Sequence, residues 1–118
     1  MAIIGAHLAA THATTPTPYY TPWQGRGGNS AVCVVDVVAE NFGSGEVLIT
    51  IETKNSDDPD SGASALDSFA VINTPPSNPP TKYVDGFLEM FRYRIEVKGD
   101  PADNWVRLRF LSPSWLPN

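Results

Sequence analysis

The residue types that most often do catalysis are scarce in this 118-residue sequence. The two histidines, His7 and His12, both lie near the N-terminus among small residues and threonines. A serine–histidine–acid relay needs an imidazole that is held rigidly beside its nucleophile. The sequence also has no glycine-rich phosphate loop between a strand and a helix. We therefore predict a protein that binds and assembles, with no enzymatic activity and no cofactor.

An acidic loop, Asn55-Ser-Asp-Asp-Pro-Asp60, is the best candidate for a metal site. Its carboxylate and amide oxygens are ligands that calcium prefers. An EF-hand loop beginning at Asp58 would need glutamate at its twelfth position, where this chain has Phe69. A looser calcium site remains an alternative, but we expect a solvated turn and no metal. The single cysteine, Cys33, excludes an intrachain disulfide, and its apolar neighbours predict a small buried side chain.

Aromatic residues are the stronger candidates for a binding site. Tyr19, Tyr20 and Trp23 lie in a segment with three prolines, which remove backbone donors and keep the chain extended. We interpret residues 1–28 as an extended N-terminal arm and residues 29–118 as the folded domain. The arm either packs on its own domain or reaches a neighbouring subunit.

Two more tryptophans follow in the last third of the chain. Trp105 is expected on an outward face and could stack on a sugar ring, which makes a carbohydrate-binding module an alternative function. Trp115 lies in a proline-containing tail and needs cover, either from its own domain or from another subunit.

Five segments are apolar or alternate between apolar and polar residues, and turn residues separate them. The segment 74–81 contains four prolines and is expected to be a stiff connection. Short strands without a helical period predict an all-β protein: an antiparallel, jelly-roll-like β-sandwich of six to eight strands in a single domain. The predicted strands are 31–39, 46–54, 66–72, 87–98 and 104–111.

The last two predicted strands have only a short loop between them and should form a hairpin. The register that keeps their apolar residues on one face pairs Val97 with Val106, Ile95 with Leu108 and Tyr93 with Phe110. Four arginines would then form one stripe on the opposite face: Arg92, Arg94, Arg107 and Arg109.

This arginine stripe has two main interpretations. Its side chains either pair with Asp and Glu of adjacent strands, or bind carboxylates of another subunit through their bidentate groups. The chain carries 13 acidic and 8 basic residues, a net charge of −5, which disfavours nucleic-acid binding. No apolar stretch is long enough to span a membrane.

Parts of the sequence resemble small virion proteins of tailed bacteriophages. The similarity lies in the Met-Ala-Ile-Ile-Gly start, in Ile51-Glu-Thr-Lys-Asn-Ser-Asp-Asp58 and in Phe91-Arg-Tyr-Arg-Ile-Glu-Val97 with the final strand. Apart from this start, the resemblance covers about residues 30–111, within which 74–81 departs from the pattern, as does the tail 112–118. The resemblance implies a non-enzymatic capsid decoration protein, made in the host cytoplasm and placed on the capsid exterior.

We expect this protein to bind the major capsid protein or other virion subunits, and to form a homo-oligomer such as a trimer. A tail or connector subunit is an alternative. The residues predicted to contact partners are Tyr19, Tyr20, Trp23, Arg92, Arg94, Trp105, Arg107, Arg109 and Trp115.

Overall fold

The computed structural model describes residues 7–11, 18–41, 45–73, 76–98 and 105–117. They form ten strands and one short 3-10 helix. The strands are β1 (His7–Thr11), β2 (Tyr19–Tyr20), β3 (Gln24–Gly25), β4 (Ser30–Asn41), β5 (Glu46–Lys54), β6 (Ser64–Ser68), β7 (Thr81–Asp85), β8 (Met90–Lys98), β9 (Trp105–Phe110) and β10 (Ser114–Trp115). The helix, η1, is Asp60–Gly62 and lies just before β6.

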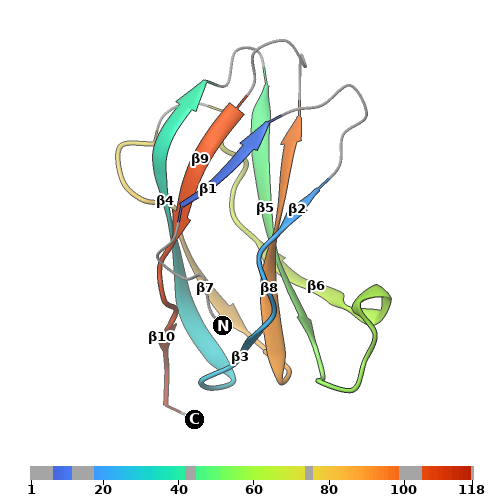
Figure 1. The fold of residues 1–118 in the computed structure, drawn as a ribbon. Helices are drawn as coiled ribbons and strands as arrows, with labels where there is room; N and C mark the ends of the chain where they lie inside the picture. The colour runs from blue at the N-terminus through green and yellow to red at the C-terminus, as the bar shows by residue number, and fades with distance from the viewer. Residues whose placement is uncertain (1–6, 12–17, 42–44, 74–75, 99–104, 118) are drawn as a thin grey trace.

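The strands build two antiparallel sheets that pack against each other (Figure 1). In the first sheet β1, β9, β4 and β7 are neighbours in that order, and β10 continues beyond β9 along β4. In the second sheet β2 and β3 both pair with β8, which pairs with β5, and β5 pairs with β6. The predicted all-β sandwich is confirmed.

The strand order is that of a jelly roll. The ten strands reduce to eight when β2 with β3, and β9 with β10, are counted as single interrupted strands. Successive strands then alternate between the two sheets, except that β5 and β6 are adjacent in the second. This connectivity closes the sandwich with two Greek keys.

The alternating residues of the long strands fill the core, as the sequence predicts. Val47, Ile49 and Ile51 on β5 are fully buried, and the inward residues of β8 and β9 are buried as well. Cys33 is also buried, and this burial raises the pKa of its thiol. The core is therefore made by period-two alternation on both sheets.

The predicted hairpin between the last two long strands is wrong. β8 pairs with β5 in the second sheet, whereas β9 pairs with β4 and β1 in the first. The apolar residues of β8 and β9 meet face to face across the core, where the rings of Tyr93 and Phe110 stack with centroids 4.3 Å apart. Both arrangements bury the same side chains, so alternation alone did not distinguish them.

The described part of the N-terminal segment is hydrogen-bonded to its own domain. β1 pairs with β9 at the edge of the first sheet, and β2 and β3 pair with β8 at the edge of the second. Pro22 separates β2 from β3, and Thr21 bridges the gap by exchanging hydrogen bonds with the backbone of Tyr93. Of the two arrangements considered for the arm, these residues adopt the intramolecular one. His12 and the rest of residues 12–17 lie outside the described residues.

Two other parts of the chain differ from the sequence-based expectations. The strand expected at 66–72 is β6, which ends at Ser68, and Ile72 forms only an isolated bridge to Val47. A strand that was not predicted, β7, follows the proline-rich connection and pairs with β4. Within the described ranges, no helix is long and apolar enough to cross a membrane.

Candidate functional site

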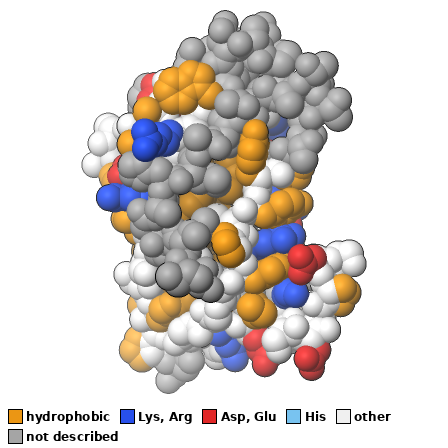
Figure 2. Space-filling view, in the orientation of Figure 1, with side chains coloured by type: hydrophobic (Ala, Val, Ile, Leu, Met, Phe, Trp, Pro, Cys, Tyr) orange, Lys and Arg blue, Asp and Glu red, His pale blue; other side chains and the backbone are white. Residues whose placement is uncertain are grey.

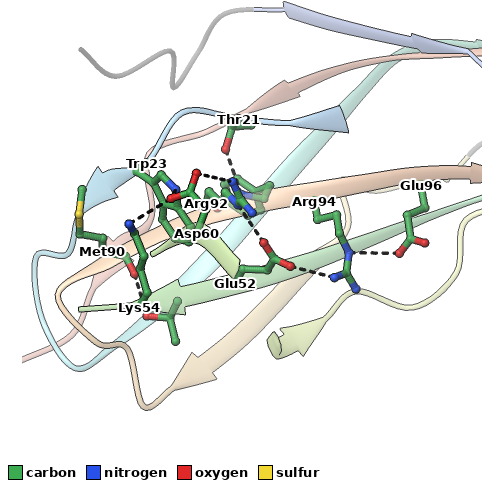
Figure 3. A network of polar contacts seen from close by, with 11 residues as sticks. Thr21, Trp23, Glu52, Lys54, Asp60, Met90, Arg92, Arg94 and Glu96 are labelled. Carbon is green, nitrogen blue, oxygen red and sulfur yellow. Dashed lines mark hydrogen bonds and ion pairs between the residues drawn. The ribbon is translucent and has the colours of Figure 1, made fainter. Parts of the chain in front are cut away.

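A cluster of charged and aromatic side chains covers the outer face of the second sheet. Its centre is Glu52 on β5, which lies directly opposite Arg92 of β8. The Glu52 carboxylate accepts a hydrogen bond from Arg92 Nε at 2.8 Å and another from Arg94 Nη1 at 2.8 Å (Figure 3). Arg94 also lies 3.3 Å from the carboxylate of Glu96. Period-two alternation places all four side chains on the same face.

Aromatic residues of the N-terminal segment complete this cluster. The Arg92 guanidinium lies 3.9 Å from the centroid of the Tyr20 ring and 4.4 Å from that of Trp23. The Trp23 indole donates a hydrogen bond to Asp60 in η1 at 2.9 Å, and Lys54 lies 4.9 Å from the Trp23 ring. These cation–π contacts and hydrogen bonds attach β2 and β3 to the sheet.

Opposite charges balance within the cluster. Three cations, Lys54, Arg92 and Arg94, face three carboxylates, Glu52, Asp60 and Glu96. Basic and acidic side chains lie side by side on the β6 side of the molecule (Figure 2). A hydrogen bond from Lys54, with further help from Trp23 and Arg92, lowers the pKa of Asp60. The cluster is therefore neutral overall and is an internal contact network, not an electropositive surface.

The structure divides the predicted partner-binding residues among three places. Tyr20, Trp23, Arg92 and Arg94 lie together in the charged cluster. Arg107, Arg109 and Trp105 lie on β9, in the other sheet. Tyr19 and Trp115 pack against the core, where the Trp115 ring makes edge contacts with Phe87 and Phe91.

The prediction of a single arginine stripe is therefore wrong, because β8 and β9 belong to different sheets and their outward side chains point in opposite directions. Three of the four arginines pair with acidic residues of this same chain. Besides Arg92 and Arg94, Arg109 lies 3.4 Å from Asp36 of the adjacent strand β4. These three arginines therefore follow the first of the two interpretations, which is pairing with acidic residues of the same chain.

The outer face of the first sheet carries an apolar patch that sequence reasoning missed. Val32 and Val34 on β4 point outward and are only partly covered, and Tyr83 on β7 lies directly opposite Val32. Tyr83 is 55% exposed, more than any other large hydrophobic side chain among the described residues. We call Val32, Val34 and Tyr83 the apolar face. The run 31–39, which is apolar on both faces except for Asp36, was the available signal, since a strand with one solvated face should alternate.

A pocket of about 280 Å³ lies at the connection between β6 and β7. None of the predicted site residues lines it. Its walls are mainly apolar, with the side chains of two asparagines and one threonine: Phe69, Ala70, Val71, Ile72, Asn73, Pro76, Asn78, Pro80 and Thr81.

The acidic loop is held by contacts within the chain. Asp58 accepts a hydrogen bond from the backbone of Asn55 at 3.1 Å, and Asp60 binds Lys54 and Trp23. Among the described residues there is no group of three or more His, Cys, Asp or Glu side chains that could hold a metal ion.

No protein-family model, curated protein or solved structure matches this chain.

Proposed function

We propose that this protein is a non-enzymatic structural subunit of a tailed-bacteriophage virion, a capsid decoration protein that binds the major capsid shell. The sequence resemblance motivates the proposal. The jelly-roll topology agrees with it, because viral capsid subunits commonly have this fold, although the same fold also occurs in lectins and cupins. A fold alone does not assign a function, whereas the chemistry of a surface indicates what it can bind.

The apolar face is the observation that carries the proposal. A sheet with one solvated side normally presents polar residues to water. Here a tyrosine that is 55% exposed lies beside two outward valines, and together they form a contiguous apolar surface. Such a surface, next to the Asp36–Arg109 pair, is typical of a protein-binding site with a polar rim.

The charged cluster on the opposite sheet has a different role in this proposal. Its arginines are already paired, so that a partner would have to displace Glu52 before binding them. Tyr20 and Trp23 hold the N-terminal segment on the domain by stacking on Arg92. We therefore assign the shell contact to the apolar face, with Arg107 and Trp105 at the far end of the same sheet as additional contacts.

The test is binding to capsid shells assembled from the major capsid protein encoded beside this gene, measured by co-sedimentation. Tyr83→Ser should weaken binding by about tenfold or more, because truncating a hot-spot aromatic side chain at the centre of an interface costs about 2 kcal/mol. Val71→Ser is the matched control, since Val71 is similarly exposed, at 47%, but lies on the β6–β7 connection. Equal binding by both variants would contradict the assignment of the apolar face. A gene without capsid, portal or protease genes nearby would contradict the virion assignment.

Carbohydrate binding is the second candidate, because Trp105 is 39% exposed at the start of β9 and lectins also use this topology. A glycan array probed with the native chain and with Trp105→Ala separates the two functions. Signals that depend on Trp105 would favour the carbohydrate function. A tail or connector location would be recognised by imaging labelled subunits on intact particles.

A further inference from the structure

The edge strands of the sandwich differ in how they are protected from pairing with another chain. An unpaired strand edge exposes backbone N–H and C=O groups, and proteins usually block it with proline, lysine, a bulge or a very short strand. On β7 the edge is blocked by Lys82, which lies opposite the buried Cys33 and reaches across to Asp67 of β6 at 3.7 Å. On β6 a bulge interrupts the register with β5, and Pro22 divides the β2–β3 edge into two-residue pieces. The edge strand β10 has only two residues.

The edge strand β1 has none of these features. Its sequence, His-Leu-Ala-Ala-Thr, contains no proline and no Lys, Arg, Asp or Glu. It pairs with β9 over five residues without a register shift. Among the residues that the structure describes, nothing pairs with its other side.

The hydrogen-bond pattern shows which residues of β1 face that side. Just beyond β9, the backbone N–H of Leu111 donates a hydrogen bond to the carbonyl of Val34 on β4. Backbone N–H and C=O groups of successive residues in a strand point to opposite sides, so those of Leu108 and Val106 point toward β1. Their partners on β1 are Leu8 and Ala10. The backbone groups of the other three residues of β1 therefore point away from the sheet: His7, Ala9 and Thr11.

We propose that a second copy of this chain pairs with β1 through its own β1, antiparallel, about a two-fold axis at Ala9. Ala9 then exchanges two backbone hydrogen bonds with Ala9 of the other copy, and His7 lies opposite Thr11. An antiparallel edge is complementary to itself, which is the requirement of a two-fold interface. Because β1 carries no carboxylate or lysine, two copies meet without like charges on the paired strands.

The first sheets of the two copies would join into one continuous sheet. A five-residue strand pair buries much less surface than a standard interface, so the isolated dimer should be weak. Many copies held close together on a particle would raise its occupancy through effective concentration. This dimer rests on the proposed assembly function, but its test uses the purified chain without any capsid shell. A chain that does not dimerise can therefore be distinguished from a chain that does not bind the shell.

The decisive variant is Ala9→Pro, measured by sedimentation equilibrium over a concentration series. It removes the outward N–H of Ala9 and leaves the bonds of Leu8 and Ala10 to β9 intact, as proline is tolerated on the open side of an edge strand. The loss of two hydrogen bonds should raise the dimer dissociation constant by about tenfold or more. Ala9→Val is the matched control and should dimerise like the native chain.

Two further measurements test the β1–β1 dimer independently of the Ala9→Pro variant. Thr11→Lys places a charge at the same edge and should weaken the dimer even if the proline variant unfolds. Amide hydrogen exchange should show concentration-dependent protection at His7, Ala9 and Thr11, whereas Leu8 and Ala10 stay protected at every concentration. A native chain that remains monomeric up to about 1 mM, or variants that dimerise like the native chain, would overturn the proposal.

Discussion

Replacing Glu52 by glutamine tests whether the charged cluster holds the second sheet together. Glu52 is the single carboxylate that bonds both Arg92 and Arg94, and its side chain is only 7% exposed. The substitution keeps the shape of the side chain and removes its charge. Both arginines would then lose their shared anion in a mostly covered position.

The loss of stability caused by Glu52→Gln can be estimated from how exposed its two partners, Arg92 and Arg94, are. A hydrogen bond to a charged group contributes about 1.5–3 kcal/mol when it is well covered, which describes Arg92 at 12% exposure. Arg94 is 29% exposed and keeps Glu96, so we assign its bond to Glu52 only about 1 kcal/mol. We therefore expect Glu52→Gln to lower the free energy of unfolding by about 3 kcal/mol. For a chain of this size, that corresponds to a fall in Tm of roughly 10 °C.

The assay is urea and thermal unfolding followed by circular dichroism, with Glu96→Gln as the control on the same face. Glu96 contacts Arg94 alone among these arginines and is 30% exposed, so its substitution should cost about 0.5 kcal/mol or less. Equal costs for the two variants would refute the reasoning. The arginines would then be solvated side chains, free to bind a partner.

Three further predictions concern the core, a glycine and the pH dependence. The Tyr93 hydroxyl is buried beside the Cys33 thiol, a weak hydrogen-bonding group, and has no partner of ordinary geometry among the described residues. Tyr93→Phe should therefore leave the free energy of unfolding unchanged or raise it by up to about 1 kcal/mol in urea unfolding; a decrease of more than about 1 kcal/mol would show that the hydroxyl makes a stabilising hydrogen bond. A Cβ at Gly27 would lie 2.5 Å from the Trp115 ring, so Gly27→Ala should destabilise by about 1–3 kcal/mol in the same assay. Gly25→Ala, where a Cβ meets nothing within 4 Å, should be neutral, and equal effects would argue against close packing at Gly27. Because the pKa of Asp60 is lowered in the folded chain, the stabilisation that its carboxylate gives the fold is complete at pH values above the ordinary carboxyl pKa. This stabilisation is lost as the pH falls through the lowered pKa of Asp60. Tryptophan fluorescence should show a change in this acid range for the native chain and not for Asp60→Asn.

Several features could be predicted from the sequence because they depend on local pattern. The β5 strand has the predicted bounds, Glu46–Lys54, and its alternate residues Val47, Ile49 and Ile51 are buried. The apolar surroundings of Cys33 correctly indicated its burial. Turn and proline positions, together with the absence of a helical period, were enough to predict an all-β sandwich.

The candidate site was only partly predictable. The sequence identified Tyr20, Trp23, Arg92 and Arg94 as unusual residues, but no sequence pattern distinguished Glu52, which binds both arginines. The ladder between β5 and β8 brings Glu52 next to Arg92 and Arg94, which lie 40 and 42 positions away in the sequence, and no local pattern encodes that pairing.

The sequence by itself determined which side chains of the long strands point into the core, because a period of two assigns alternate residues to one face of each strand. Only the tertiary structure decided which strands are neighbours. Burial of apolar surface is non-directional, so Tyr93 and Phe110 gain as much by stacking across the core as they would by lying side by side in a hairpin. This strand order placed β8 and β9 in different sheets, divided the arginines between two outer faces, and left Tyr83 exposed beside the partly covered Val32 on one of them.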